Sequence, residues 1–369
     1  MYEELTNRFI QKAFKYSKSE QERIAEAARY SCVAHQGQKR HSGEPYIIHP
    51  YAVAEILISI NMDVDTVIAG LLHDTIEDTE ITFDMLNEKF GETVASLVEG
   101  ETKISALKAK NKSQQEAETI RKMFFAMSKD VRVIIIKLAD KLHNMRTLQH
   151  LSPQRAKEIA NETLDIFAPL ADRLGMSWLK GELEDQSLKI LRPDTYFYIE
   201  EYLLSKKSER TAYLARIEKN IYRICADQGL GNVLVQSRTK HTYGVYLKMK
   251  KRKIELEEMG DILGVRIICD TVNECYTLLG IVHKLWPPMA GRFKDYIAMP
   301  KANNYQSLHT TVMALDGKVL EIQIRTREMH GTAEYGVAAH WVYKSKSGIG
   351  GDSSWMNKDS EQFTKILSK

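Results

Sequence analysis

The chain has 369 residues, 43% of them hydrophobic and 27% charged, a composition typical of globular proteins and unlike that of disordered or fibrous ones. Domains commonly hold ~100–200 residues, so this length predicts two of them. A net charge of +3 is small for such a chain, so affinity for anions must come from local basic clusters. No apolar run approaches the ~20 residues of a membrane span, and the cysteines form no C-x-x-C pair. We expect a cytoplasmic protein with reduced cysteines and no membrane contact.

The first half of the chain, from residue 19 to about residue 193, has the hydrophobic spacing of helices. Gly91 is placed to end one helix, and Ser152 followed by Pro153 is placed to begin another. The segment VRVIIIKLAD is rich in β-branched residues, but its apolar positions fit a helical repeat and its neighbours favour a helix. We interpret the polar stretch 108–115 as a loop.

After residue 230 the pattern changes to that of alternating strands and helices. The segments NVLVQSR, DILGVRIICD, SLHTTVMAL and VLEIQIRT are typical of strands, and CYTLLGIVHKLW is typical of a helix between them. The sequence therefore predicts an all-α domain followed by an α+β domain. The stretch SKSGIGGDSS at 345–354 has the composition of a linker.

The segment LLHDTIEDT at 71–79 places two ionisable doublets close together. If Asp65 caps a helix through this segment, His73 and Glu77 lie four residues apart on one helical surface, and so do Asp74 and Asp78. A His-Asp doublet alone is more often part of a surface turn than of a metal site. The prediction of a site therefore depends on partners elsewhere in the helical half.

Those partners are His49 upstream and Asp140 downstream. Two imidazoles and two carboxylates form a mixed ligand set suited to a divalent cation such as Mn²⁺: His49, His73, Asp74 and Asp140. Such a cation lowers the pKa of its water, and Glu77 or Asp78 beside it can position that water or take its proton. The set predicts metal-dependent hydrolysis. Three other histidines have no partner recognisable from spacing and are interpreted as structural or surface residues: His35, His143 and His150.

Longer motifs carry a resemblance to a known family. The order His…His-Asp…Asp in a helical domain resembles the HD phosphohydrolase superfamily. The motifs HSGEPYIIHP, LLHDTIEDT and LADKLHNMRTL resemble the hydrolase domain of the RelA/SpoT family, whose members make and destroy the alarmone (p)ppGpp. The motifs SRTKHTYGVYLKM, DILGVRI, GRFKDYIAMPKANNYQSLHTTV and EIQIRTREMHGTAEYGVAAHWVYK resemble the synthetase domain of that family, in the same order.

The resemblance implies two opposed reactions on one chain. A hydrolase domain at 1–195 removes the 3′-pyrophosphate of (p)ppGpp with Mn²⁺, giving GDP or GTP. A synthetase domain at 196–345, with a nucleotidyltransferase-like mixed sheet, transfers pyrophosphate from ATP to the 3′-hydroxyl of GDP or GTP with Mg²⁺, releasing AMP. Residues 346–369 are expected to be a linker or tail. Ribosome and tRNA are expected to be bound only through carboxy-terminal domains that this sequence does not contain.

The same resemblance supplies the residues that contact the hydrolase substrate. His41 stands where many relatives carry another polar or basic residue. This difference from the family pattern affects only the contact that residue 41 is expected to make with the base of the substrate. The substrate-binding set is Arg40, His41, Ser42, Tyr46, Asn144 and Thr147.

Pyrophosphoryl transfer requires positive charge around the phosphates, a divalent cation and an aligned hydroxyl. In VLEIQIRT, alternation directs Glu321 away from the core, where it can bind Mg²⁺ and receive the hydroxyl proton. Asp261 resembles the other Mg²⁺ ligand of the family, and Tyr305 is the candidate for stacking on guanine. The other nucleotide-binding candidates are basic or polar: Arg238, Lys240, Lys248, Arg266, Arg292, Lys294, Lys301, Asn303, Gln306 and His309.

Arg266 presents a difficulty, because Asp261 and Arg266 would point to opposite sides of a regular strand. A bulge at Gly264, or reach around the end of the strand, would reconcile the two. The basic stretch RFKD at 292–295 resembles the bifunctional members of the family, since synthetase-only relatives carry an acidic version.

Two alternative functions remain open at this stage. The first is a tRNA nucleotidyltransferase with an attached HD domain, although the Gly-rich entry to an Asp-x-Asp pair is missing and the domain order is normally the opposite. The second is a regulatory binding protein with one silent site, although the predicted ligands are all retained. For a bifunctional enzyme, the helical stretch Leu151–Ala226, with Pro169 as a possible kink, is expected to couple the two sites.

Overall fold

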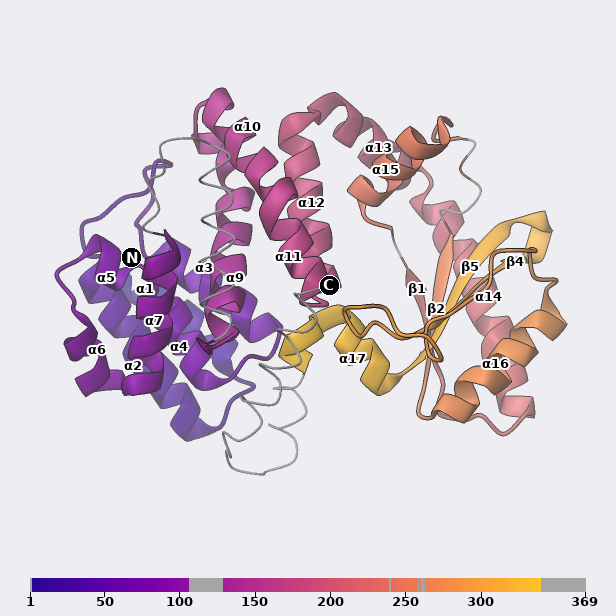
Figure 1. The fold of residues 1–369 in the computed structure, drawn as a ribbon, viewed down its shortest axis with the longest axis horizontal. Helices are drawn as coiled ribbons and strands as arrows, with labels where there is room; N and C mark the ends of the chain where they lie inside the picture. The colour runs from indigo at the N-terminus through magenta and orange to yellow at the C-terminus, as the bar shows by residue number, and fades with distance from the viewer. Residues whose placement is uncertain (1, 106–128, 239, 258, 260–262, 340–369) are drawn as a thin grey trace. The chain divides into compact units, whose positions relative to one another are not determined.

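The computed structural model describes residues 2–105, 129–238, 240–257, 259 and 263–339 (Figure 1). These residues form two compact units that divide between Pro169 and Leu170, the second unit ending at Val337. The expected loop at 108–115, the linker at 345–354 and the tail at 346–369 lie outside the described residues, as does Asp261.

The first unit consists of helices throughout its described part, as predicted. The segment VRVIIIKLAD lies in α9, which confirms that it is helical. The helices are α1 (Tyr2–Ile10), α2 (Lys18–Ala34), α3 (Ile48–Ser59), α4 (Val64–Leu72), α5 (Thr75–Asp78), α6 (Phe83–Phe90), α7 (Glu92–Ser105), α9 (Arg132–Arg146) and α10 (Pro153–Glu162), with the 3-10 turns η1 (Gln11–Ala13) and η2 (Leu148–His150).

The ends of these helices follow the local sequence, with one correction. Ser152 caps α10 ahead of Pro153, and Gly91, with φ of 89°, ends α6, both as predicted. The prediction that Asp65 caps α4 is wrong. Asp63 is the cap, because its carboxylate accepts a hydrogen bond of 3.1 Å from the backbone N–H of Thr66, and Asp65 lies in the first turn.

The core of the first unit surrounds α4, which contacts α2, α3, α7 and α9. All seven residues from Thr66 to Leu72 are buried, so this helix is apolar on every side. Gly70 allows α3 to come close, since a Cβ at this position would lie 2.4 Å from Leu57 Cδ1. Two neighbouring helices joined by a short connection run antiparallel, so the start of α3 and the end of α4 lie at one end of the core.

The chain passes from the first unit to the second through an irregular turn. A π-helical turn, η3 (Thr163–Phe167), leads into α11 (Ala168–Arg173), which contains Pro169. Proline has no N–H to donate to the carbonyl of Asp165, and a local π turn is one way a helix accommodates that loss. The position expected to be a kink therefore coincides with a change of helical winding.

The second unit opens with further helices, and its first strand begins at Leu234, well after residue 195. Its helices are α12 (Ser177–Leu191), α13 (Pro193–Ser205), α14 (Lys207–Asp227), α15 (Thr242–Arg252), α16 (Val272–Leu285) and α17 (Arg327–Tyr335). Its strands are β1 (Leu234–Arg238), β2 (Gly264–Cys269), β3 (Lys294–Asp295), β4 (Leu308–Met313) and β5 (Val319–Thr326), with the 3-10 turns η4 (Leu315–Gly317) and η5 (Gly336–Ala338).

Within the described residues, five strands form one sheet in the order β1-β2-β5-β4-β3. The pair β2 and β5 is parallel and the other pairs are antiparallel, which confirms the predicted mixed sheet. All four predicted strand segments contain strands, whereas the short β3 has no strand signal in the sequence. Along one line across the sheet, Arg238, Gly264, Glu321 and Thr311 are neighbours.

One face of the sheet is apolar and is covered by α14 and α16 (Figure 1). Leu320, Ile322 and Ile324 point into this layer and are fully buried, as their alternation predicts. The opposite face therefore carries Glu321 and the polar residues that alternate with the apolar set. Among the candidate nucleotide-binding residues, Arg238, Arg266 and His309 lie on this second face.

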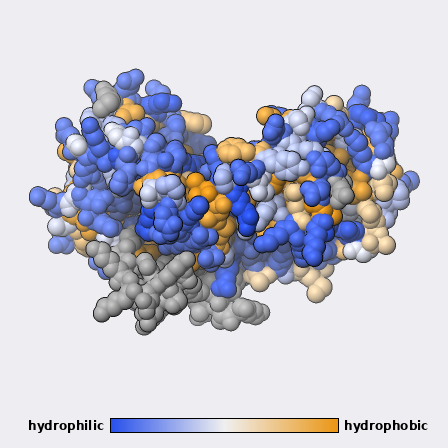
Figure 2. All heavy atoms as spheres, turned by 90° about the horizontal axis from the view of Figure 1, so that it is seen from above, coloured by the Kyte–Doolittle hydropathy of each residue, from blue (hydrophilic) through white to orange (hydrophobic). Residues whose placement is uncertain are grey.

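Hydrophilic side chains dominate the visible surface of the described residues, and the hydrophobic ones form small groups among them (Figure 2). Among the helices of the described part, none combines the length and the apolar character needed to cross a membrane.

Gly336 ends α17 in a conformation that other residues rarely adopt. Its φ is 55°, and a Cβ would lie 1.8 Å from the carbonyl oxygen of Leu174. We expect Gly336→Ala to lower the free energy of unfolding of the second unit by about 2 kcal/mol or more. Alanine is strained at this φ, and its Cβ would push the backbone away from the carbonyl oxygen of Leu174. The measurement is the denaturant midpoint of the second unit.

Gly280→Ala is the matched control, because Gly280 lies in α16 with open space at its Cβ position. Alanine is favoured over glycine inside a helix, so this variant should gain ~0.5–1 kcal/mol. Equal midpoints for the two variants would show that the contact with Leu174 does not matter.

Candidate metal centre and nucleotide site

The metal centre forms at the end of the core where α3 begins and α4 stops. His49 lies in the first turn of α3, and His73 directly follows α4. The prediction that both doublets share one helix is wrong, because α4 ends at Leu72 and α5 begins only at Thr75. His73 and Asp74 occupy the junction, where His73 turns inward and is buried.

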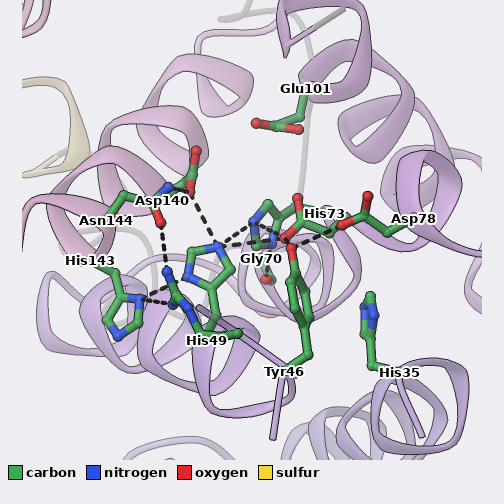
Figure 3. Close-up of polar contacts among 12 residues, drawn as sticks. His35, Tyr46, His49, Gly70, His73, Asp78, Glu101, Asp140, His143 and Asn144 are labelled. Atoms are coloured by element: carbon green, nitrogen blue, oxygen red, sulfur yellow. Dashed lines mark hydrogen bonds and ion pairs between the residues drawn. The ribbon is translucent and has the colours of Figure 1, made fainter. Parts of the chain in front are cut away.

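Four ligand atoms from three separate segments converge at this junction (Figure 3). His49 Nε2 lies 3.2 Å from His73 Nε2 and 3.2 Å from Asp140 Oδ1. Asp74 Oδ2 lies 3.5 Å from His49 Nε2 and 3.2 Å from His73 Nε2. The predicted set of four is thus brought together, and His49, His73 and Asp140 form a group able to hold a metal ion.

Hydrogen bonds behind the imidazoles select the tautomers that a metal requires. His73 Nδ1 lies 2.9 Å from the carbonyl oxygen of Gly70, so Nδ1 carries a proton and Nε2 is the nitrogen that faces the centre. His49 Nδ1 lies 2.7 Å from His143 Nδ1, which also accepts a hydrogen bond of 3.0 Å from Arg40. Because His143 is an acceptor there, His49 Nδ1 is the donor, and its Nε2 is free to bind a cation.

His143 was interpreted from the sequence as structural or surface, and its contact with His49 was missed. Burial lowers the pKa of His143 to about 3, so the ring is neutral and able to accept. The available signal was its position on α9, three residues after Asp140, which puts the two side chains on neighbouring parts of one helical face.

The electrostatic environment favours a cation at this centre. Burial alone would lower the pKa of His73, but Asp74 and the other nearby carboxylates outweigh burial and raise it to about 10. Burial would raise the pKa of Asp140, yet Lys137 and His49 hold it well below its usual range. Lys137 Nζ lies 2.9 Å from Asp140 Oδ2 and 2.7 Å from Glu101 Oε1, which fixes the carboxylate.

Tyr46, Glu77 and Asp78 border the centre on its open side. The Tyr46 hydroxyl lies 2.7 Å from Asp74 Oδ2 and 2.9 Å from Asp78 Oδ2, so it joins the metal set to α5. Glu77 and Asp78 are exposed. Burial and the neighbouring carboxylates Glu101 and Asp74 raise the pKa of Glu77, which suits a group that exchanges protons with water.

A pocket of about 390 Å³ lies next to the metal centre in the first unit. The guanidinium of Arg40 orders one wall, donating to Asn144 Oδ1 at 3.0 Å and to Thr147 Oγ1 at 3.3 Å. Five of the six predicted substrate-binding residues line it, and Tyr46 lies at the metal centre instead. Sequence reasoning missed the other lining residues, which include Lys141, His150, Leu151, Arg155, Ile159 and Glu162.

In the second unit, Glu321 occupies the polar face of the sheet between two cations. Arg238 Nη1 lies 3.3 Å from Glu321 Oε1, and Lys240 Nζ lies 3.2 Å from Glu321 Oε2. Burial raises the pKa of Glu321, but Lys240 and Arg238 outweigh burial and hold it below its usual value. The carboxylate is therefore ionised and available to a metal ion or a proton.

Arg266 lies on this same face, because its partners in register are Gln236 and Gln323. Arg266 therefore lies on the same face of the sheet as Glu321, on the neighbouring strand and two residues further along it. The strand β2 begins at Gly264, and the comparison with Asp261 falls outside the described residues.

An aromatic cluster borders the basic face. The Tyr305 hydroxyl lies 2.8 Å from His309 Nε2, and Lys301 Nζ lies 4.9 Å from the ring centres of both Tyr305 and Tyr296. Burial lowers the pKa of His309 to about 4, so its ring is neutral. A half-buried tyrosine ring beside a cation provides a surface on which a base can stack.

The remaining candidates lie further from Glu321 or are engaged elsewhere. Asn303 Nδ2 donates to the carbonyl of Asp172, and Gln306 Nε2 to that of Ile297. Lys294 pairs with His309 at the exposed edge of the sheet, and Arg292 is exposed just before it. Lys248 lies on α15 rather than on the sheet.

Comparison with known proteins finds a family model for each half of the chain. Residues 27–177 match the family model described as HD domain, and residues 237–348 match the model described as a region found in RelA/SpoT proteins. The HD match coincides with the metal centre, since domains of that class hold divalent metals.

Curated relatives match nearly the whole chain. One is a probable guanosine-3′,5′-bis(diphosphate) 3′-pyrophosphohydrolase of Synechocystis, 48% identical over 341 residues, or 92% of this chain and 45% of the relative. The GTP pyrophosphokinase of Myxococcus xanthus is 47% identical over 343 residues, 92% of this chain and 44% of the relative. The bifunctional (p)ppGpp synthase/hydrolase of Mycobacterium tuberculosis is 46% identical over 354 residues, with coverage of 93% and 48%.

The chain spans about half the length of these curated relatives. Both family models match in the order that the motifs predict, and each match contains one of the two sites described above. The chain belongs to the RelA/SpoT family of (p)ppGpp synthetases and hydrolases.

Proposed function

We propose that this chain both hydrolyses and synthesises (p)ppGpp, using one site in each unit. The observation that carries the proposal is the presence of two separate clusters of charged residues: the convergent side chains around His49 in the first unit, and the basic face around Glu321 in the second. A regulatory protein with a silent site would have no need to keep both sets. Incubation with labelled ATP and GDP, and separately with (p)ppGpp and Mn²⁺, tests both directions.

For hydrolysis, His49, His73, Asp74 and Asp140 would hold a Mn²⁺ ion, which would supply an activated water and neutralise charge on the 3′-pyrophosphate. Glu77, with its raised pKa, accepts the proton of the attacking water, and Asp78 orients that water together with Tyr46. Arg40, Asn144 and Thr147 bind the guanosine part in the adjoining pocket. The reaction returns GDP or GTP and pyrophosphate.

For synthesis, Arg238 and Lys240 turn from Glu321 to the phosphates of ATP. Glu321, with Asp261 as the other predicted ligand, would hold a Mg²⁺ ion, which would neutralise charge on those phosphates. Glu321 also receives the proton of the 3′-hydroxyl as that oxygen attacks the β-phosphorus of ATP, and AMP leaves. Arg266 contacts the adenine, and Tyr305 stacks on the guanine of the acceptor. The other predicted basic residues, Lys248, Arg292, Lys294 and Lys301, surround the phosphates or tune the preference for acceptor and metal.

An HD-containing tRNA nucleotidyltransferase is the weaker alternative. The relatives found carry synthetase and hydrolase names for guanosine polyphosphates. Incubation of the chain with ATP, GDP and tRNA distinguishes the two, because the label enters GDP in one case and the tRNA end in the other. Any inputs from ribosome and tRNA are proposed to act through regions present in the longer relatives.

Asp140→Ala should abolish hydrolysis of (p)ppGpp and Mn²⁺ binding while synthesis persists, because Asp140 lies among the metal ligands of the first unit only. Removal of metal with a chelator should have the same effect on hydrolysis, and added Mn²⁺ should restore it. The exposed Asp165→Ala on η3 is the control and should change neither activity. Equal loss of both activities in folded Asp140→Ala protein would contradict the proposed division of labour.

His143→Leu should weaken Mn²⁺ binding by roughly 10–100-fold, because the ring that fixes the tautomer of His49 is lost. His143→Asn is the matched variant, since its amide oxygen can accept the hydrogen bond from His49 Nδ1. We expect it to bind Mn²⁺ more tightly than His143→Leu in calorimetric titration. Identical affinities in the two variants would show that this hydrogen bond does not hold the metal ligand in place.

Glu321→Gln should reduce synthesis by roughly 10²–10⁴-fold, the usual contribution of a general base, with hydrolysis unaffected. Tyr305→Ala should chiefly raise the KM for GDP, by the ~1–3 kcal/mol that stacking of one base contributes. Tyr305→Phe keeps the ring and loses only the hydrogen bond to His309, so it should behave nearly as the unmodified protein. A normal KM for GDP in Tyr305→Ala would rule out stacking.

A further inference from the structure

The segment EMHGTAEYG, which lies on α17 and ends at Gly336, has no role in the function proposed so far. Its acidic residue Glu334 is the second-last residue of the helix and lies against the polar face of the sheet, with about a quarter of its side chain exposed. Helix α17 contacts both β2 and β5, the strands that carry Arg266 and Glu321. Glu334 is thus the acidic group of α17 that faces the candidate nucleotide site.

One oxygen of Glu334 holds two arginines from neighbouring strands. Glu334 Oε1 lies 2.9 Å from Arg266 Nη2 and 3.0 Å from Arg325 Nη2. Arg325 Nη2 also donates to His330 Nδ1 at 2.7 Å, one turn earlier on the same helix. Glu334 and His330 together therefore tie both guanidinium groups to α17.

The two arginines need a carboxylate between them, because they are close to each other and poorly solvated. The Arg325 side chain is only 1% exposed and that of Arg266 only 17% exposed. Burial and the charge of Arg325 together lower the pKa of Arg266 to about 10, although Glu334 opposes both effects. Without Glu334 the two like charges would repel each other in a site of low dielectric constant.

Each arginine reaches a different part of the proposed synthetase site. Arg266 lies on the sheet face next to Glu321, where ATP is proposed to bind. The guanidinium carbon of Arg325 lies 6.0 Å from the ring centre of Tyr305, the platform proposed for guanine. A single carboxylate on α17 therefore orders the surroundings of both nucleotides.

The end of α17 is itself fixed to a neighbouring turn of the second unit. The backbone N–H of Val337 donates to the carbonyl oxygen of Leu174 at 3.0 Å, and Gly336 packs against the same turn. This attachment sets how far Glu334 projects toward the sheet. Asn303, two residues before Tyr305, donates to the carbonyl of Asp172 at the same turn.

We propose that Glu334 is a positioning residue for synthesis, which clamps Arg266 and Arg325 so that the ATP and guanine subsites form together. The inference rests on the proposed synthetase function of this face. Glu334 does not touch the reacting atoms and acts only through the two arginines.

The test is Glu334→Gln, which keeps the size of the side chain and removes its charge. It should weaken binding of both α,β-methylene-ATP and GDP by about tenfold or more in calorimetric titration, the usual effect of breaking a buried charge pair. In the synthesis assay KM should rise for both substrates more than kcat falls. Glu334→Asp, which keeps the charge, should recover part of the affinity.

Glu328→Gln is the matched control, because Glu328 is an exposed glutamate in the first turn of the same helix. It should bind both nucleotides as the unmodified protein does. A double variant separates positioning from general packing: in an Arg266→Gln background, Glu334→Gln should weaken ATP-analogue binding no further. Additive losses, or unchanged binding in folded Glu334→Gln protein, would overturn the proposal.

The binding measurement also keeps this inference separate from the proposed activity. If the unmodified chain made no (p)ppGpp yet lost nucleotide affinity on Glu334→Gln, the clamp would stand and the synthetase function would fall. If the unmodified chain were active and Glu334→Gln bound and reacted equally well, the clamp would fall and the synthetase function would stand.

Discussion

Two imidazole nitrogens lie 3.2 Å apart and close to two carboxylates at one end of the core, an arrangement able to hold a metal ion. The first unit is built around this arrangement. The apolar helix α4 and the close approach at Gly70 bring His49 and His73 to one end of the core. The carbonyl of Gly70 and the ring of His143 then fix both tautomers. The centre is pre-organised by groups that do not themselves bind the ion, which is how metal sites gain affinity and specificity.

The candidate site of the second unit carries an excess of positive charge, whereas the site of the first unit gathers groups that attract a cation. Its sheet buries one apolar face against α14 and α16, and the other face gathers guanidinium and ammonium groups around two carboxylates. Glu321 and Glu334 each hold a pair of cations, so the face keeps an excess of positive charge close to a tyrosine ring. Such a surface suits polyphosphates attached to a base, and it complements a first unit that attracts a metal ion.

The sequence predicted the features that follow from local spacing. Alternation in 319–326 identified the two faces of β5, and the order of His49, His73, Asp74 and Asp140 identified four side chains that the structure brings together. Features that depend on backbone geometry or on distant contacts could not be read in the same way. The break between α4 and α5 turns His73 inward, and Asp63 rather than Asp65 caps the start of α4. His143 and Glu334 gain their importance from partners about 90 and 70 residues away along the chain, which no periodicity records.

The central claim is that each unit holds its own charged site, one for a metal ion and one for nucleotides. Hydrogen exchange of backbone amides, measured for the free chain, with Mn²⁺ alone, and with α,β-methylene-ATP, GDP and Mg²⁺, tests it most directly. The account predicts that Mn²⁺ slows exchange in the first turns of α3, at residues 70–78 and in α9, and that the nucleotides slow exchange in β2, β5 and α17. Mn²⁺ that left α3 and α9 unchanged, or nucleotides that left β5 and α17 unchanged, would contradict it.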